Sequence, residues 1–302
     1  MENMIETHEL SRRFGQTEAV HHLTLQVPTG SFYAFLGSNG AGKTTTIKML
    51  MNIIHPTGGQ ATVLGKDSQT LSENDFQQIG YVSENQKLPE WMTVGRFIAY
   101  CRPFYPTWDD AFCQRLLKQF DLPLNKKLSS LSRGMKVKAA LLSSLAYRPK
   151  LLILDEPFTG LDAFVRDEFI RGVLELSEQA DWTIFVSSHD IDEVERLCDR
   201  VGLINRGELQ VQESLDSLQA RFRRLEFILP AAAAPPPLET FPGWIRTETV
   251  GHGGQIIDAA YEAGVSEQRI MAHWPGATNI TASPLSLREI FLEIARQERL
   301  TA

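Results

Sequence analysis

The sequence has few cysteines and no long apolar run. Its three cysteines, Cys101, Cys113 and Cys198, are widely spaced and form no Cys-x-x-Cys motif. This odd, scattered set argues against a disulfide framework or a zinc knuckle and favours a reducing compartment. No apolar stretch approaches the roughly 20 residues that a helix needs to span a bilayer. The N-terminal MENMIETHEL lacks the apolar core of a secretory signal, so we expect neither a transmembrane segment nor a signal peptide here.

The chain also has no excess of positive charge. Acidic residues outnumber basic ones by 37 to 30, which gives a net charge of -7. An acidic chain disfavours a general nucleic-acid-binding role, so we expect no nucleic-acid partner. With 302 residues, 43% hydrophobic and 22% charged, the chain suits one large domain or two unequal ones, and long disorder is excluded.

Short apolar runs and helical patterns alternate along the first two thirds of the chain. Three runs are typical of strands buried on both faces of a parallel sheet: 31–37, 151–155 and 182–189. After the first run, one helix face is predicted to end at the sequence His-Pro-Thr-Gly-Gly: Ile47, Leu50, Met51 and Ile54. This alternation predicts an α/β fold with right-handed crossovers.

Composition divides the rest of the chain. Residues 85–150 combine helical spacing with several prolines and predict a mostly helical insertion. The sequence AAAAPPP at 231–237 is typical of an exposed linker. Beyond it, two β-like runs around a glycine-rich turn predict a hairpin, and 285–298 predicts an amphipathic helix. We therefore expect two domains, residues 1–215 and a small α+β appendage at 216–302.

The sequence GSNGAGKT at 37–44 matches the phosphate-loop pattern G-x-x-x-x-G-K-[ST] between a predicted strand and a predicted helix. Its glycines let the backbone curl so that N–H groups point at an anion, and the helix N-terminus adds positive potential. Lys43 is placed to reach the β- and γ-phosphates of a nucleotide, and the Thr44 hydroxyl to ligate Mg²⁺. We expect the nucleotide to contact Gly37, Ser38, Asn39, Gly40, Ala41, Gly42, Lys43, Thr44 and Thr45.

Three further segments are candidates for the same site. The strand LLILD ends at Asp155, a candidate ligand of Mg²⁺, and Glu156 is placed to orient or deprotonate a water that attacks the γ-phosphate. His189 follows another strand and can hydrogen-bond a phosphate. In LSRGM, Ser132 and Gly134 can receive an anion at a helix N-terminus. Taken alone, a helix cap explains Ser132 better, and a structural role explains His189 better.

In this order, the segments resemble the ATP-binding cassette (ABC) family over residues 3 to about 215. GSNGAGKT is similar to its Walker A motif, LSRGM to its signature, LLILDE to Walker B, TGLD at 159–162 to its D-loop, and His189 to its switch histidine. The resemblance implies a P-loop NTPase with a mainly parallel sheet, an N-terminal antiparallel β part and a helical subdomain at about 85–150. It also implies an ATPase that uses ATP and Mg²⁺, with Lys43, Glu156 and His189 as catalytic residues.

The resemblance also implies contacts beyond the chain. In the family, two cassettes pack head to tail, and the signature of one closes over the ATP held by the other. Ser132 and Gly134 would then bind the γ-phosphate of a partner's ATP, and Asp162 would lie at the dimer contact. A homodimer and a heterodimer both remain open. Phe14 matches the family's adenine-stacking aromatic, with a buried strand-end residue as the alternative.

Three positions depart from the family's pattern. Glu84, with Gln86 two residues further on, is the residue that aligns where the Q-loop usually has glutamine; a carboxylate can still meet Mg²⁺ or water, but it donates no hydrogen bond. Glu84 therefore joins Thr44 and Asp155 as a candidate metal ligand. In the signature, Arg133 replaces a glycine of the common LSGGQ, and Met135 replaces its glutamine, which removes an amide from the γ-phosphate region.

Within the family, the chain is most similar to separately encoded ATPase subunits of bacterial exporters. This implies a membrane-spanning permease as partner and a place on the cytoplasmic face of the cell membrane. The segment 84–108 would touch the permease through aromatics that can equally form the helical subdomain's own core: Trp91, Phe97, Tyr100, Phe104, Tyr105 and Trp108. Two alternatives are a soluble ABC ATPase acting in translation or DNA repair and a non-hydrolysing regulatory cassette. The appendage would support dimerisation, tune ATPase activity or bind a small ligand, and its sequence selects none of these.

Overall fold

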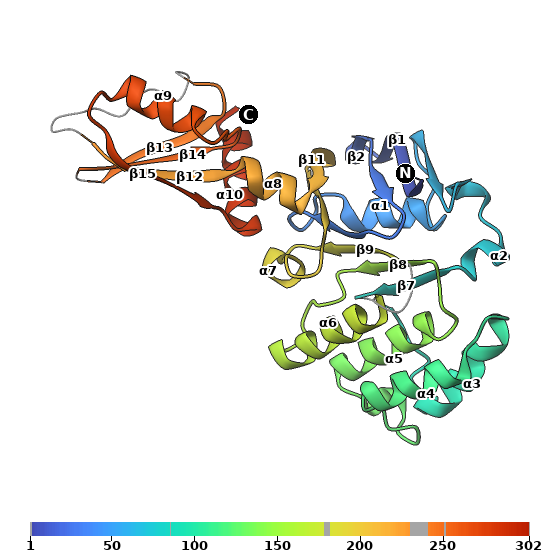
Figure 1. The fold of residues 1–302 in the computed structure, drawn as a ribbon. Coiled ribbons are helices and arrows are strands. Elements are labelled where there is room, and N and C mark those ends of the chain that lie inside the picture. Colours follow the sequence, from blue (N-terminus) through green and yellow to red (C-terminus); the bar gives the residue numbers. More distant parts are fainter. Residues whose placement is uncertain (1, 85, 178–181, 230–240, 251, 302) are drawn as a thin grey trace. The chain divides into compact units, whose positions relative to one another are not determined.

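The computed structural model describes residues 2–84, 86–177, 182–229, 241–250 and 252–301. The chain forms two compact units, Met1–Gln212 and Glu213–Ala302, each with its own hydrophobic core (Figure 1). The predicted linker at 231–237 lies outside the described residues. No helix in the described part of the chain is long and apolar enough to cross a membrane.

A six-stranded sheet with the order β11-β10-β4-β9-β8-β7 forms the centre of the first unit. Its strands are β4 (Phe32–Leu36), β7 (Ile79–Ser83), β8 (Leu151–Asp155), β9 (Thr183–Ser188), β10 (Arg200–Asn205) and β11 (Glu208–Ser214). The strands from β10 to β7 pair in parallel. Every residue of β4, β8 and β9 is buried, as their continuous apolar runs predict. The carboxyl ends of these strands meet at one edge, where ligands bind in sheets of this kind.

Helix α1 (Lys43–Leu50) follows β4 and is shorter than the sequence predicts. The expected helix face continues to Ile54, but Asn52 adopts a φ of +53°. The N–H groups of Ile53 and Ile54 both donate to the Lys48 carbonyl, an arrangement that ends a helix. Ile54 still packs against the core from outside the helix. The apolar pattern therefore predicts correctly that Ile54 packs against the core, but it overestimates the length of the helix.

The N-terminal part of the first unit forms a second, antiparallel sheet. In it, β1 (Asn3–Phe14) pairs with β2 (Thr17–Leu23), β3 (Gln26–Pro28) and β5 (Gly58–Val63), and β5 pairs with β6 (Lys66–Asp67). Buried residues of β1, of α1 and of β4 belong to a single core. This shared core fixes the end of β1, which carries Phe14, relative to the loop between β4 and α1.

Helices occupy most of the chain between β7 and β8, where the sequence predicts a helical insertion. The helices of the unit after α1 are α2 (Glu73–Phe76), α3 (Val94–Cys101), α4 (Asp110–Gln119), α5 (Arg133–Leu145), α6 (Ala163–Ser177) and α7 (Ile191–Val194), with 3-10 turns at 68–70, 102–104 and 128–130. Side-chain caps begin three of them: Thr93, Asp109 and Ser132 each accept a bond from the N–H three residues later.

The second unit is built on four antiparallel strands in the order β13-β14-β12-β15. Its elements are α8 (Leu215–Arg221), β12 (Arg223–Ile228), β13 (Trp244–Val250), β14 (Gly253–Asp258), α9 (Val265–His273), β15 (Thr278–Pro284) and α10 (Leu287–Thr301). The predicted hairpin is confirmed by the pairing of β13 with β14, and the predicted terminal helix by α10. Leu225 and Phe227 of β12 share a core with Ile270 of α9, whereas Arg224, one position before Leu225 and so on the other face of the strand, pairs with Glu289 of α10. The two helices therefore cover opposite faces of the sheet.

Candidate active site

The loop between β4 and α1 has a backbone that only glycine can follow. A Cβ at Gly37 would lie 2.4 Å from the carbonyl oxygen of Ile204. Gly42 has a φ of +111°, and a Cβ there would lie 2.6 Å from the carbonyl oxygen of Ala19. Residues with side chains would therefore displace the loop from the N-terminus of α1, where backbone N–H groups attract an anion.

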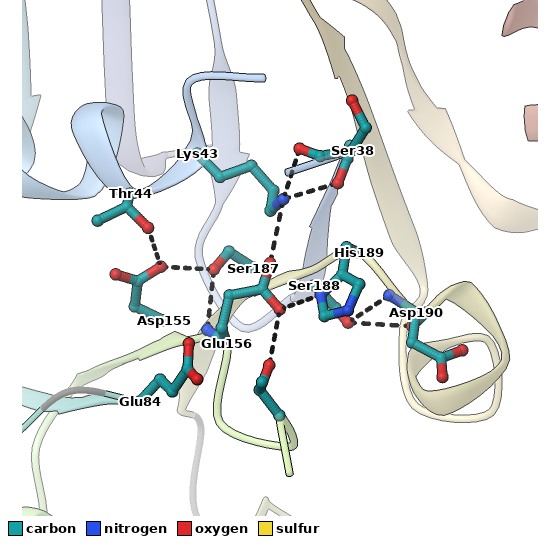
Figure 2. A network of polar contacts seen from close by, with 12 residues as sticks. Ser38, Lys43, Thr44, Glu84, Asp155, Glu156, Ser187, Ser188, His189 and Asp190 are labelled. Atoms are coloured by element: carbon teal, nitrogen blue, oxygen red, sulfur yellow. Dashed lines mark hydrogen bonds and ion pairs between the residues drawn. The ribbon is translucent and has the colours of Figure 1, made fainter. Parts of the chain in front are cut away.

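Lys43, the first residue of α1, folds back over this loop (Figure 2). Its ammonium donates to the carbonyl oxygens of Gly37 at 2.6 Å and Ser38 at 3.1 Å. The same nitrogen lies 3.0 Å from Glu156 Oε1. Lys43 is buried, with 4% of its surface exposed. A buried cation is thus held at the mouth of the loop by oxygens for which phosphate oxygens can substitute.

Asp155 is the last residue of β8 and contacts Thr44. Its Oδ1 accepts hydrogen bonds from Thr44 Oγ1 at 3.0 Å and from Ser187 Oγ at 2.8 Å. Burial raises the pKa of this carboxyl above its ordinary value, and the two hydroxyl donors offset only part of that effect. The chain therefore keeps a costly carboxylate where its oxygens face the phosphate loop.

Glu156 turns sharply out of the strand. Its φ of +52° is a conformation that residues with side chains rarely adopt, and its N–H is fixed by the carbonyl and hydroxyl oxygens of Ser187, at 3.2 and 3.1 Å. This turn brings Oε2 to 2.7 Å from His189 Nδ1 and 3.3 Å from the Thr159 hydroxyl. A carboxylate, a histidine and the Lys43 ammonium therefore meet within hydrogen-bond reach (Figure 2).

Ser132 and Gly134 have roles within their own chain. Ser132 Oγ accepts from the Met135 N–H at 3.2 Å and so caps α5, while the residue itself is exposed. Gly134 is buried, and a Cβ there would lie 2.7 Å from a methyl group of Val165 in α6. Gly134 is thus required for the packing of α5 on α6, whether or not an anion approaches it.

Glu84 and Phe14 lie at the margins of this arrangement. The Glu84 N–H donates to the carbonyl oxygen of Asp155 at 2.9 Å, but its carboxylate accepts from Arg133 Nη2 at 2.7 Å. Phe14 is 47% exposed, which excludes the buried strand-end alternative, and the Arg12 guanidinium lies 4.5 Å from its ring centre. One face of the ring is therefore covered by a cation.

Known proteins resemble this chain in sequence and in fold. Residues 20–159 match the family model described as ABC transporter. The chain is 34% identical over 232 residues to the bacitracin transport ATP-binding protein BcrA of Bacillus licheniformis, and the match covers 76% of each. The chain belongs to the ABC transporter family. The family, the α/β P-loop fold and the ATPase activity predicted from the sequence are thereby confirmed.

Other relatives agree with this assignment. This cassette is 35% identical over 225 residues to the probable multidrug ABC transporter ATP-binding protein YbhF of Escherichia coli strain K12, a match of 73% of this chain and 39% of that protein. A solved structure described as an ATP binding subunit of an ABC transporter matches with a TM-score of 0.65 at 27% identity, over 72% of this chain and 92% of that one. The chain is accordingly an ATP-binding subunit of the ABC transporter type.

Sequence reasoning missed Ser187 as a member of the site. Ser187 donates to Asp155 and accepts from the Glu156 N–H, so it connects the two acidic residues. The available signal was its position near the end of β9, the neighbour of β8 in the parallel sheet. A serine there is unremarkable by itself, because the pairing of β8 with β9 that gives it meaning is a tertiary contact.

Replacing Asp155 with Asn is expected to abolish ATP hydrolysis without lowering the thermal stability of the cassette measured without nucleotide. Because burial raises the carboxyl's pKa, its ionised form destabilises the fold at neutral pH, and that penalty is relieved as the pH falls through the raised pKa. Asn retains an acceptor for both hydroxyls and carries no charge. Scanning fluorimetry should therefore give an equal or higher Tm for the variant at neutral pH, and a difference that shrinks toward acidic pH. A clear drop in Tm at neutral pH would contradict this account.

Proposed function

We propose that this cassette binds ATP with Mg²⁺ at the edge formed by the 37–44 loop, Asp155 and Glu156, and that hydrolysis drives a separate membrane permease. The observation that carries the proposal is the set of contacts around Glu156. Its carboxylate lies 3.0 Å from the Lys43 ammonium and 2.7 Å from the His189 ring. Three functions thus meet at one edge of the sheet: Lys43 can bind phosphate, Glu156 can accept a proton from water, and His189 can orient both.

ATP binding would change the partners of Lys43. Phosphate oxygens would attract the ammonium, which now contacts Glu156 and two carbonyl oxygens. Glu156 would then be free to accept a proton from water, whose oxygen bonds to the γ-phosphorus while the bond to the bridging oxygen breaks and ADP leaves. His189 would orient Glu156 during this step and contact the γ-phosphate.

The oxygens of Thr44 and Asp155 fit a magnesium ion. Thr44 Oγ1 and Asp155 Oδ1 are 3.0 Å apart and are hard oxygen ligands. Mg²⁺ is usually held by one or two protein oxygens together with phosphates and water, and when bound it neutralises charge on the phosphates. We assign this role to Thr44 and Asp155 and not to Glu84, because the Glu84 carboxylate is paired with Arg133.

The surface around the site suits a second cassette. Ser132 is exposed at the N-terminus of α5, and Asp162 is exposed just before α6. In the pairing that the family resemblance implies, these two residues would face the nucleotide and the chain of the second cassette. Phe14 would stack on adenine with the ring face that Arg12 leaves open.

The aromatic residues of the 84–108 segment divide between core and surface. Phe97 is buried, with 6% exposure, whereas three others are 70%, 55% and 57% exposed: Trp91, Tyr100 and Phe104. A cavity of about 330 Å³ is lined by residues of the same segment, among them Phe97 and Tyr105, by residues of α5, and by Tyr147, which follows α5. Exposed aromatic side chains are typical of a protein-binding surface. We assign the three exposed aromatics to the permease, on the cytoplasmic face of the membrane.

We further infer export as the direction of transport. Two relatives reported above are named for bacitracin transport and for multidrug transport. In a transporter of this type, the transported compound would contact the permease, so the compound itself would be recognised by residues of the other chain.

The permease is expected to co-purify with the tagged cassette from membranes extracted in mild detergent, at near-stoichiometric yield by mass spectrometry. A variant with Trp91, Tyr100 and Phe104 changed to Ala should lose the permease yet still bind a fluorescent ATP analogue. Met271→Ala serves as the matched control, because Met271 is 47% exposed in the second unit. A cassette absent from the membrane fraction would overturn the transporter assignment.

A further inference from the structure

Two of the residues that depart from the family's pattern contact each other. Arg133 Nη2 donates to Glu84 Oε1 at 2.7 Å, across 49 positions of sequence. The glutamine and glycine that are common at these positions in the family have no charge to pair. In this chain the two opposite charges form an ion pair between segments that are far apart in the sequence.

The ion pair joins the catalytic edge to the start of α5. At one end, the Glu84 N–H donates to the carbonyl oxygen of Asp155 at 2.9 Å, so Glu84 is fixed to the strand that ends in the acidic pair. At the other end, Arg133 is the first residue of α5 and directly follows its cap, Ser132. A displacement of the end of β7 would therefore be transmitted to Ser132, the residue proposed to contact the nucleotide of the second cassette.

A third segment packs on the same guanidinium. Gly160, in the turn after Glu156, has a φ of +71°, and a Cβ there would lie 2.6 Å from Arg133 Nη1. The glycine thus leaves room for the Arg133 side chain beside the turn. Arg133 is in this way in contact with residues that follow both β7 and β8.

We propose that Glu84 and Arg133 are positioning residues, whose ion pair sets the orientation of Ser132 and the first turn of α5 relative to the catalytic edge. The inference rests on the proposed pairing of two cassettes. The Glu84 and Arg133 side chains are 29% and 49% exposed. An ion pair with this exposure contributes little to the stability of the fold and can form and open during the ATPase cycle. Its role is therefore to orient α5.

The first turn of α5 supplies a matched control. Lys136, three residues after Arg133, donates to Glu90 Oε1 at 2.6 Å. The Glu90 carbonyl oxygen accepts from the Ser129 N–H at 3.1 Å, so this second pair connects α5 to the segment just before it. Lys136 and Glu90 therefore form an ion pair on the same helical turn, and among the described residues their polar side chains contact neither Asp155 nor Glu156.

The test measures ATP-induced dimer formation in the Glu156→Gln cassette by light scattering. Glu84→Gln and Arg133→Gln are each expected to raise the ATP concentration for half-dimerisation on the order of threefold, as for a half-exposed pair. The double variant should show no further loss, and the exchange Glu84→Arg with Arg133→Glu should recover most of it. Lys136→Gln and Glu90→Gln should leave dimerisation unchanged. Additive losses, or equal losses in the control pair, would overturn the proposal.

A second measurement separates this inference from the pairing on which it rests. Amide hydrogen exchange of the first turn of α5 is compared with and without ATP in the same cassette. ATP should slow exchange there in the parent, and Glu84→Gln or Arg133→Gln should remove the change, whereas Glu90→Gln should not. If ATP slows exchange in the parent cassette but the cassette stays monomeric, the result contradicts the pairing of two cassettes and supports the positioning role of the Glu84–Arg133 ion pair. A parent in which ATP has no effect on this turn overturns the positioning role.

Discussion

Glu156→Gln is expected to leave ATP bound and to lower turnover by roughly 10²- to 10⁴-fold, the usual contribution of a general base. The amide has the shape of the carboxylate but cannot accept a proton from water. Its loss of charge also removes the ion pair with Lys43, 3.0 Å away, so the ammonium becomes more available to phosphate. Phosphate release measures turnover, and titration with a fluorescent ATP analogue measures binding.

Glu73→Gln is the control for this change. Glu73 is an exposed glutamate in α2 of the same unit, and its substitution should change neither turnover nor binding. Turnover near the parent's in Glu156→Gln would remove Glu156 from the role of base. Loss of ATP binding in that variant would instead indicate that the residue mainly holds Lys43 in place.

Lys43→Ala is expected to weaken ATP binding by roughly 30-fold or more. The ammonium that would bind the phosphates is lost, and truncating one partner of a buried charge pair has an effect of this size. Glu156 has 12% of its side chain exposed and would lose its nearest cation. The Tm of the cassette should therefore also fall. Titration with the fluorescent ATP analogue and scanning fluorimetry measure the two effects separately.

Lys48→Ala tests whether the effect belongs to the site. Lys48 lies on the same helix, α1, but is exposed in its last turn. Its loss should alter neither ATP affinity nor stability by a comparable amount. Unchanged ATP affinity in Lys43→Ala would count against the assignment of the 37–44 loop to phosphate.

Local patterns in the sequence were sufficient for the framework of the first unit. The run LLILD became β8 without a shift of either end, because a strand buried on both faces needs apolar side chains at every position. The loop at 37–44 was predictable because its glycines and Lys43 act through backbone geometry that neighbouring residues determine. Asp155 and Glu156 are predictable as candidates because acidic residues are unusual at the end of a buried strand.

Features that depend on contacts between distant segments were not predictable in this way. Ser187 gains its role only when β9 lies beside β8. The Glu84–Arg133 pair could not be read from either local sequence, since each residue stood out only as a departure from a pattern. The sequence of the signature predicts that Gly134 leaves room for an anion, whereas its packing against Val165 depends on a contact between α5 and α6 that neither local sequence shows.

The close contact of α5 and α6 has a consequence for how two cassettes would meet. Gly134 packs against Val165, and further along the helices the buried Lys138 donates to Glu168 at 2.5 Å. The segment before α5 carries Ser132, and the segment before α6 carries Asp162. These two contact points of the proposed pairing are thus attached to a pair of helices that pack closely against each other. They would engage the partner together or not at all, so a halfway-closed pair with only one of them docked should be scarcely populated.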